Sequence, residues 1–326
     1  MPVGEPRKVL YLSHAPAEVY DIIRAEVPPG YGLVTLERDD DALRLAKIAE
    51  MPFVIVAATR LTRPLIEAAG RLELVHHQGV GYQDTIDLEA LRRHGAALAL
   101  TPEGTTVSVA EHAIMLTLAV LRRLTFADAE LRRGRFHINA LRPVSRNLEG
   151  RLIGYIGMGR IGQAVAVRAK AFGARGLYFD PADPLTEAAA AALDLRAAPL
   201  DEVIAGAEIL TLHVPATPAT RHLIDAAAIA RMRPGAVVVN TARGPLIDER
   251  ALYDGLRSGH LGGAGLDVYD PEPPSPDNPL LRLPNVVVTP HIAGGTRDTL
   301  SEKMRAIFAN IARFDRGEEL ENRVPL

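Results

Sequence analysis

Residues 152–180 read LIGYIGMGRIGQAVAVRAKAFGARGLYFD. This stretch opens with a short apolar run that is typical of a strand and continues into a G-x-G-x-x-G turn at Gly157, Gly159 and Gly162. An amphipathic helical pattern follows the turn, and a second strand-like run ends on Asp180. Strand, glycine turn, helix, strand and acid come in the order of a dinucleotide-binding βαβ unit. The stretch therefore predicts a doubly wound parallel sheet.

The three glycines of this turn each have a physical reason in such a unit. Gly157 permits the tight turn, Gly159 lets the backbone approach a pyrophosphate, and Gly162 lets the helix pack closely on the strand. The start of the helix offers unpaired N–H groups and the positive end of its dipole to phosphates. The alternative is a glycine-rich turn without a ligand, which the flanking strand, helix and acid disfavour.

Asp180 indicates which dinucleotide would bind. Its carboxylate can accept hydrogen bonds from both ribose hydroxyls of the adenosine and would repel a 2′-phosphate. Residues 181–183 are Pro, Ala and Asp, so no Arg or Lys follows that could bind such a phosphate. The sequence therefore favours NAD over NADP.

The composition limits what this chain can do. Its 326 residues suggest two domains, and 48% hydrophobic with 24% charged residues is ordinary for a globular protein. A formal net charge of −3 gives no electrostatic argument for nucleic acid or an anionic membrane. The absence of Cys excludes disulfides, thiolate metal sites and a Cys nucleophile, and fits a cytoplasmic protein. No apolar run approaches the roughly 18 residues of a membrane span, and the N-terminal apolar run is too short for a signal peptide. We expect neither a metal nor a membrane.

Strand-like and helical segments alternate along the rest of the chain. Residues 1–100 read as one α/β unit without a phosphate fingerprint, and Thr101–Gly104 read as a hinge. The helix expected over Ser108–Arg122 is apolar nearly all round, which predicts burial on more than one side. A subunit interface and a helix that covers two domains would both explain this. A more polar arm follows over 124–147, and a last amphipathic helix is expected over Thr296–Phe314.

Polar side chains fall at or just after predicted strands downstream of the glycine turn. In a doubly wound sheet, ligands bind beyond the carboxyl ends of the strands, so these residues are candidates for chemistry. They are His213, Arg243, Asp267, Glu272 and His291.

Three of these candidates match the needs of one reaction. Reduction of a 2-keto acid requires a hydride and a proton for the carbonyl oxygen. A His such as His291 supplies the proton well because its ordinary pKa is about 6.5. A carboxylate such as Glu272 would orient it, and Arg243 could bind the substrate carboxylate in a bidentate fork. Taken singly, these residues could instead be a strand-end cap, a solvated loop residue and a salt-bridge partner.

Successive motifs of the chain resemble the signatures of the D-isomer-specific 2-hydroxyacid dehydrogenases. The resemblance covers about residues 50–295, with the motifs in the family's order and spacing. The motifs are HHQGVGYQDTIDL, TPEGTTVSVAEHAIML, LIGYIGMGRIGQAVA, LHVPATPATRHLI, VVVNTARGPLIDERAL, GAGLDVYDPEP and VVVTPHIAGGT.

This resemblance implies a role for each matching residue. Arg243 would bind the substrate carboxylate and carbonyl, while His291, paired with Glu272, would donate the proton in reduction and accept it in oxidation. Val80 and Gly81 would hold the substrate carboxylate through backbone N–H groups. The implied cofactor contacts are Arg160 and Ile161 on the pyrophosphate beside the turn glycines Gly157, Gly159 and Gly162, Asp180 on the ribose, and His213, Val214, Pro215, Thr241 and Asp267 on the adenine or nicotinamide side.

The family architecture is two Rossmann-like domains. By resemblance, an NAD-binding domain over 103–294 is inserted into a flavodoxin-like substrate domain formed by 1–102 and 295–326. The family is usually dimeric through the helix and arm that follow the hinge, so a homodimer is expected.

Departures from the family pattern bear on the substrate. The loop Gly81–Asp87 is one residue longer than usual, with Thr85 where Asn is expected. Val56 and Ala58 stand where members that act on 3-phosphoglycerate carry Arg, and the Lys that phosphite-oxidising members have near Val80 is missing. The expected substrate is therefore a small unphosphorylated 2-keto acid, glyoxylate or hydroxypyruvate first.

Two other functions are alternatives. One is 3-phosphoglycerate dehydrogenase, and the other is a non-enzymatic NAD-sensing protein similar to the family's corepressors. His76 and His77 are unusual before the substrate loop, and they are either structural at a strand end or at the mouth of the pocket.

Overall fold

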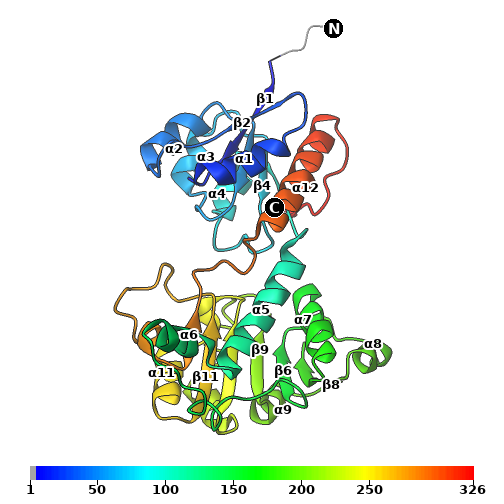
Figure 1. Cartoon of the computed structure of the whole chain (residues 1–326). Coiled ribbons are helices and arrows are strands. Elements are labelled where there is room, and N and C mark those ends of the chain that lie inside the picture. The colour runs from blue at the N-terminus through cyan, green and yellow to red at the C-terminus, as the bar shows by residue number, and fades with distance from the viewer. Residues whose placement is uncertain (1–4) are drawn as a thin grey trace. The chain divides into compact units, whose positions relative to one another are not determined.

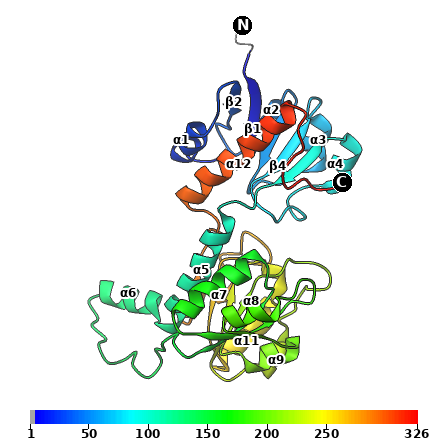
Figure 2. The same cartoon turned by 90° about the vertical axis from the view of Figure 1, so that its right-hand side faces the viewer.

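A computed structural model describes residues 5–326 of the chain (Figures 1 and 2). The chain divides into two compact units. The first contains the residues up to Thr105 together with Gly295–Leu326, and the second contains Thr106–Gly294. The chain thus leaves the first unit once and returns to it for its last helix. The assignment of the units to substrate and cofactor binding stays a prediction.

The first unit is built on a five-stranded parallel sheet with strand order β2-β1-β3-β4-β5. This is the flavodoxin-like order, so the predicted fold class is confirmed here. The strands are β1 (Arg7–Tyr11), β2 (Tyr31–Val34), β3 (Phe53–Val56), β4 (Leu74–His77) and β5 (Ala97–Leu100).

Helices cover both faces of this sheet because its central strands are apolar on both sides. Val9 and Tyr11 of β1 pack in one core with α1 (Ala17–Ala25) and α12 (Arg297–Asp315). Leu10 points to the opposite face, as alternation in a strand requires. That face is covered by α2 (Asp41–Ile48), α3 (Arg63–Ala68) and α4 (Leu88–His94), as Figure 2 shows.

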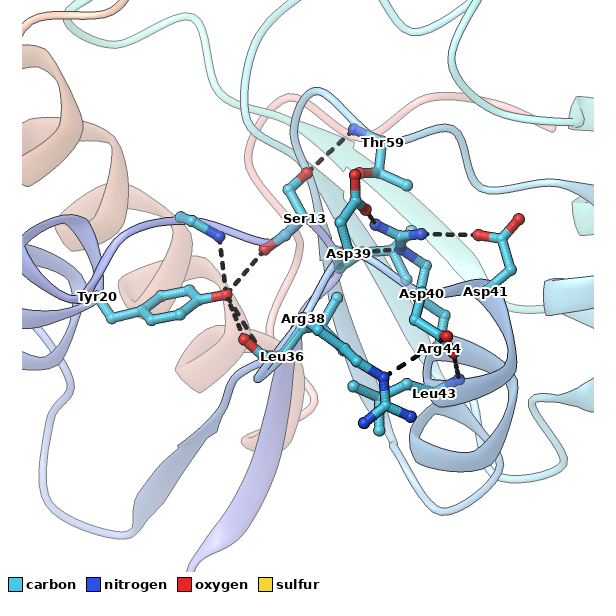
Figure 3. A network of polar contacts seen from close by, with 12 residues as sticks. Ser13, Tyr20, Leu36, Arg38, Asp39, Asp40, Asp41, Leu43, Arg44 and Thr59 are labelled. Carbon is cyan, nitrogen blue, oxygen red and sulfur yellow. Dashed lines mark hydrogen bonds and ion pairs between the residues drawn. The ribbon is translucent and has the colours of Figure 1, made fainter.

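Polar contacts fix the loops at the carboxyl ends of β1, β2 and β3 (Figure 3). The Ser13 hydroxyl accepts the Thr59 N–H at 3.0 Å, which joins the loops after β1 and β3. The Tyr20 hydroxyl lies 3.1 Å from the Leu36 carbonyl oxygen and 3.3 Å from that of Ser13. These loops form the edge at which ligands bind in such sheets.

Arg44 on α2 is a buried cation in the same network (Figure 3). Its Nε donates to the Leu12 carbonyl oxygen at 3.2 Å, and its guanidinium pairs with Asp39 and Asp41. Burial alone would lower the pKa of Arg44, but these two carboxylates raise it overall. The ion pairs therefore keep the guanidinium charged inside the loop network.

The second unit contains a seven-stranded parallel sheet with order β12-β11-β10-β9-β6-β7-β8. The order reverses at β6, which lies between β7 and β9, so the switch point falls at the glycine turn. The doubly wound sheet predicted from this stretch is confirmed. The strands are β6 (Leu152–Ile156), β7 (Arg175–Phe179), β8 (Leu195–Ala197), β9 (Ile209–Leu212), β10 (Ala236–Asn240), β11 (Leu261–Leu266) and β12 (Val286–Val288).

Helices again cover both faces of this sheet (Figure 1). One core joins the sheet to α5 (Thr105–Leu121), α7 (Arg160–Ala171) and α8 (Glu187–Ala192). The other joins it to α9 (Leu200–Gly206), α10 (Ala226–Arg231) and α11 (Glu249–Arg257). The remaining elements are α6 (Leu124–Arg132) in the arm and the short 3₁₀ helices η1 (Gly244–Leu246) and η2 (Pro279–Arg282).

Two glycines of β11 let α5 approach the sheet closely. A Cβ on Gly263 would lie 2.6 Å from a methyl carbon of Val120, and one on Gly265 would lie 2.9 Å from the Leu116 Cβ. These distances are too short for any side chain, so glycine is required at both positions. The packing against β11 explains one buried side of the apolar helix predicted over 108–122.

Within residues 5–326, no helix combines the length and the apolar character that a membrane span needs.

Candidate active site

The glycine turn after β6 has the close contacts that the sequence predicts. Gly157 has a φ of 94°, a left-handed conformation that favours glycine. A Cβ on Gly162 would lie 2.4 Å from the Gly157 carbonyl oxygen, so α7 could not pack as closely on the turn with any other residue there. Gly159 is the residue before α7, which begins at Arg160 and Ile161.

Gly159 differs from the other two glycines because the space around it is open. A Cβ built on it would have no atom of the chain within 4 Å. Its φ of −68° is available to any residue, so the fold itself does not require glycine there. The open space beside the first N–H groups of α7 fits a phosphate.

Asp180 lies beside this turn at the end of β7. Its Oδ2 accepts the Met158 N–H at 2.8 Å, and its Oδ1 accepts the N–H groups of Ala182 and Asp183 at 3.1 and 3.2 Å. A carboxylate has about four lone-pair positions, so Oδ2 keeps one for a further donor. One ribose hydroxyl can donate to that position without rearrangement. A second ribose hydroxyl could bind only if residues 181–183 shifted, because Oδ1 already accepts two of their N–H groups.

The carboxyl end of β9 also borders the glycine turn. A Cβ on Gly157 would lie 2.8 Å from the backbone carbon of His213, and the His213 ring nitrogen Nε2 lies 3.0 Å from the Thr211 hydroxyl. Burial lowers the pKa of His213 to about 4, so the imidazole is neutral. Val214 and Pro215 continue from it, and their predicted cofactor contacts stay predictions.

Thr241 at the end of β10 carries a buried hydroxyl that finds no hydrogen-bond partner within residues 5–326. Buried polar atoms are nearly always paired, so an orphan of this kind points to a ligand. This hydroxyl, the open space at Gly159 and the lone pair of Asp180 are compatible with a dinucleotide at this edge of the sheet, and its contacts with these residues stay predictions.

His291 and Glu272 form the central contact of the candidate active site. The His291 Nδ1 lies 2.7 Å from the Glu272 Oε2, and their side chains are 48% and 35% exposed, so a small ligand can reach them. The hydrogen bond to Glu272 raises the pKa of His291, although burial opposes it. Burial would raise the pKa of Glu272, but its hydrogen bond and ion pair with His291 lower it overall.

Backbone contacts hold both side chains in place. The Glu272 Oε1 accepts the Tyr269 N–H at 3.0 Å, and the His291 N–H donates to the Asp267 carbonyl oxygen at 2.8 Å. His291 has a φ of 54°, which is uncommon for a residue with a side chain. An unfavourable backbone conformation of this kind is often kept at functional sites because the surroundings enforce it.

Arg243 lies in the turn that follows β10. The Asn240 side chain braces this turn, since its amide donates to the Arg243 carbonyl oxygen at 2.8 Å and its oxygen accepts the Ala242 N–H at 3.0 Å. A Cβ on Gly244 would lie 1.9 Å from the Tyr269 carbonyl oxygen, so the turn is packed against the segment that carries Glu272. The Arg243 charge lowers the pKa of Glu272 and opposes the rise at His291, so all three residues share one electrostatic environment.

Asp267 makes contacts that the sequence did not indicate. It is fully buried, and its carboxylate accepts the Thr289 hydroxyl at 2.5 Å and the N–H groups of Ile292 and Ala293 at 2.9 and 2.8 Å. In this structure it orders the segment on either side of His291. Its predicted cofactor contact stays a prediction.

Val80 and Gly81 lie in the first unit, in the loop after β4. The Val80 side chain is exposed. The lengthened loop closes in a turn, in which the Tyr82 carbonyl oxygen accepts the N–H groups of Thr85 and Ile86 at 3.2 and 3.1 Å. After this turn, α4 begins at Leu88 with Asp87 as its N-cap.

His76 and His77 are both buried at the end of β4, and this places them in the core rather than at a pocket mouth. The His76 Nδ1 lies 3.1 Å from the Thr101 hydroxyl, and its Nε2 lies 3.0 Å from the Asn310 amide nitrogen. His76 therefore joins β4 to Thr101 and to α12, which is the structural one of the two alternatives that the sequence left open.

Comparison with known proteins identifies the family. Residues 114–293 match the family model described as "D-isomer specific 2-hydroxyacid dehydrogenase, NAD binding domain". A glyoxylate reductase from Korarchaeum cryptofilum is 36% identical over 300 residues, which cover 91% of this chain and 87% of that protein. The chain therefore belongs to the D-isomer specific 2-hydroxyacid dehydrogenase family. The resemblance seen in the motifs is confirmed, and so is NAD as the cofactor of the matched domain.

Other relatives differ in length and in named activity. A hydroxypyruvate reductase from Thermotoga maritima is 40% identical over 81% of this chain and 83% of that protein. A D-3-phosphoglycerate dehydrogenase from Methanocaldococcus jannaschii is 40% identical over 85% of this chain but only 52% of its own length. The chain thus spans about half the length of that relative.

The fold is shared along nearly the whole chain. The structure of the TT0316 protein from Thermus thermophilus superimposes with a TM-score of 0.85 at 34% identity, over 98% of this chain and all of that one.

Proposed function

We propose that this protein is an NAD-dependent dehydrogenase that interconverts a small 2-keto acid and its D-2-hydroxy acid. The 2.7 Å contact between His291 and Glu272 carries the proposal, because it supplies an oriented acid–base group beside the cationic Arg243. Family membership and the fit of the glycine turn to a dinucleotide support it.

Each residue has a defined part in the proposed reaction. NAD, when bound at the glycine turn, supplies or accepts the hydride. Because the His291 Nδ1 is held by Glu272, Nε2 is the nitrogen that donates a proton to the carbonyl oxygen in reduction and takes it back in oxidation. Arg243 binds the substrate carboxylate and polarises the carbonyl. Carboxylate binding by the N–H groups of Val80 and Gly81 is part of the same proposal.

Glyoxylate or hydroxypyruvate is the proposed substrate. Val56 is an apolar core residue of β3, so it offers no charge to a phosphate. Arg63, which lies nearby in sequence, is held by Asp87 and Glu89 at 3.5 and 3.4 Å. The named activities of the Korarchaeum and Thermotoga relatives agree with this choice.

The 3-phosphoglycerate dehydrogenase activity is the second candidate, since the Methanocaldococcus relative bears that name at 40% identity. A parallel assay of NADH oxidation with glyoxylate, hydroxypyruvate, pyruvate, phenylpyruvate and 3-phosphohydroxypyruvate separates the two. We expect turnover of the order of 1 per second or more with one of the first two. Turnover of the phosphorylated acid alone would favour the second candidate. NADH binding without any turnover would favour the NAD-sensing alternative.

Two variants test the assigned roles. His291→Ala should lower kcat by roughly 10²- to 10⁴-fold, the usual contribution of a general acid, with NADH affinity nearly unchanged. Arg243→Ala should impair keto-acid binding more than cofactor binding. Normal saturation of Arg243→Ala with the keto acid would remove this residue from substrate binding.

We further propose that the protein is a homodimer through α5 and the arm over 124–147, which contains α6. The arm exposes large apolar side chains, among them Phe136 at 75% and Ile138 at 67%, and exposed apolar groups of this size mark interaction sites. Light scattering after size exclusion should give the mass of a dimer, and Phe136→Ser with Ile138→Ser should give a monomer. A monomeric wild type would contradict the proposal. The cytoplasmic location stays a prediction.

A further inference from the structure

Two residues of α5 reach the segment that carries His291. Ser108 and His112 are four residues apart and therefore lie on the same side of the helix. The Ser108 hydroxyl donates to the Ala293 carbonyl oxygen at 2.6 Å, and the His112 Nε2 lies 2.9 Å from the Thr289 hydroxyl. All of these residues belong to the second unit. Helix α5 thus contacts segment 289–293 at both ends of the segment, at Thr289 and at Ala293.

The hydrogen bonds around Thr289 are compatible with one direction only. The Thr289 hydroxyl has one proton, which it donates to the Asp267 Oδ1 at 2.5 Å. It can then only accept from His112, so the His112 Nε2 must carry a proton. The same Nε2 lies 3.5 Å from the Asp267 Oδ1, which is favourable for a donor facing a carboxylate. His112 is therefore a fixed N–H donor at the base of the segment.

Asp267 connects His112 and Thr289 to the residues next to His291 through its hydrogen bonds. Its carboxylate is fully buried and receives the Ile292 and Ala293 N–H groups as well as the Thr289 hydroxyl. A buried carboxylate is costly unless hydrogen bonds compensate it, so these contacts form or break together. His291 lies in the middle of this set with its uncommon φ of 54°.

We propose that His112, assisted by Ser108, is a positioning residue that keeps the His291 side chain within hydrogen-bonding distance of Glu272. This inference rests on the proposed dehydrogenase function, in which His291 moves the proton. His112 acts only through Thr289 and Asp267, and Ser108 only through Ala293. Helix α5, which begins where the chain leaves the first unit, would thus support the general acid.

Two substitutions of His112 separate this role from mere packing. His112→Leu keeps an apolar body but removes the donor, whereas His112→Gln keeps a side-chain N–H at about the same reach. A misplacement of a catalytic group by about 1 Å can cost on the order of 10²-fold in rate. We therefore expect His112→Leu to lower kcat by about 10- to 100-fold with little change in the KM for keto acid or in NADH affinity, and His112→Gln to recover most of kcat.

His260 provides a matched control. Its Nε2 lies 2.9 Å from the Ile229 carbonyl oxygen, the same length as the His112 contact, at the opposite end of β11 from Asp267. His260→Leu thus removes an equivalent imidazole hydrogen bond from the same unit. It should lower the melting temperature without lowering kcat. An equal loss of kcat in His260→Leu and His112→Leu, or failure of His112→Gln to restore kcat, would overturn the inference.

Hydrogen exchange followed by mass spectrometry supplies a readout that does not depend on activity. The Ile292 and Ala293 N–H groups are protected by Asp267. A peptide over 289–294 should therefore exchange faster in His112→Leu than in the wild type, and at the wild-type rate in His260→Leu. Unchanged exchange in His112→Leu would overturn the inference. If the wild type turns over no keto acid, the proposed function fails while this measurement still decides whether His112 orders the segment.

Discussion

The imidazole Nδ1 of His291 lies 2.7 Å from the Oε2 of Glu272, and the other carboxylate oxygen of Glu272 is held by the Tyr269 N–H at 3.0 Å. Glu272 is therefore an acceptor on both oxygens, which makes Nδ1 of His291 the donor. In the proposed reaction, the proton that reaches the substrate therefore leaves from Nε2. The same contact raises the pKa of His291 above its ordinary value, which favours the protonated form that the proposed reduction requires.

Removal of the Glu272 charge should shift the pH dependence of reduction. Because the carboxylate raises the pKa of His291, kcat/KM for the keto acid should fall as pH rises through that pKa, and in Glu272→Gln this fall should begin at a lower pH. The measurement is a pH series of kcat/KM with saturating NADH. Glu249→Gln is the control, since Glu249 accepts from the Asp270 N–H and from Asn278 in the same region. An unshifted pH profile in Glu272→Gln would mean that Glu272 does not set the pKa of His291 during reduction.

The same pair contributes to stability with a definite sign. The folded-state pKa of His291 is raised, so its contribution is fully present below the unfolded pKa of about 6.5 and is lost as pH rises through the folded value. The pKa of Glu272 is lowered, so its contribution is present above its unfolded pKa and is lost as pH falls through the folded value.

Asp180→Ala should weaken NADH binding and narrow the difference between NADH and NADPH. Loss of a charged hydrogen-bond acceptor for the ribose corresponds to about a 10- to 100-fold weaker Kd, and removal of the charge relieves repulsion of a 2′-phosphate. Fluorescence titration with each cofactor measures both effects. Asp183→Ala alters an exposed acid of the same turn and should change neither. A wild type that already prefers NADPH would contradict the assignment of Asp180.

The glycine turn was predictable from sequence because its requirements are local. Gly157 needs a left-handed φ, and Gly162 faces a carbonyl oxygen only five residues earlier in the chain. A short motif therefore specifies both the turn and the ligand it fits. The strand-end rule likewise selected Arg243, Glu272 and His291, since the edge of a parallel sheet collects such residues regardless of their separation.

The supporting contacts were not predictable because they depend on how distant segments meet. His112 and Thr289 are 177 positions apart, and His76 and Asn310 are 234 apart. Nothing in the local pattern of either segment sets this register. The return of α12 to the first sheet came from family resemblance alone, and α6 lies within an arm for which the sequence indicated only polarity.

His76 should make the protein less stable at acid pH. Burial lowers the pKa of His76 to about 3, against about 6.5 in the unfolded chain, so the folded state binds fewer protons between these values. Its contribution is therefore full above about pH 6.5 and is lost as pH falls toward 3. Its hydrogen bonds agree with a neutral ring, because Nε2 faces the Asn310 amide N–H and must accept from it, while Nδ1 donates to the Thr101 hydroxyl.

The test for His76 compares urea unfolding of wild type and His76→Leu at pH 7 and pH 5. At pH 7 the variant should lose about 1–3 kcal/mol, since Asn310 and Thr101 each lose a partner. The loss should be smaller at pH 5, where the wild type has been weakened. The exposed His14 serves as control through His14→Ala. An equal loss at both pH values would show that His76 does not contribute to the acid sensitivity.

Alanine at two glycines of the turn should separate folding from ligand binding. A Cβ on Gly162 would lie 2.4 Å from a backbone oxygen that cannot move without opening the turn, so Gly162→Ala should lower the free energy of unfolding by about 1–3 kcal/mol or more. A Cβ on Gly159 meets no atom within 4 Å, and its φ suits alanine, so Gly159→Ala should melt like the wild type or slightly higher.

Gly159→Ala, the more stable of the two variants, should be impaired in NADH binding. At Gly159 the added methyl occupies the open space where a pyrophosphate would approach the backbone, so Gly159→Ala should raise the NADH Kd about tenfold or more despite its intact fold. Thermal melting with and without NADH measures both quantities in one experiment, because a ligand that binds the folded state raises its melting temperature to an extent set by its affinity. An NADH-induced shift in Gly159→Ala equal to that of the wild type would mean that the open space at this glycine is not the phosphate site.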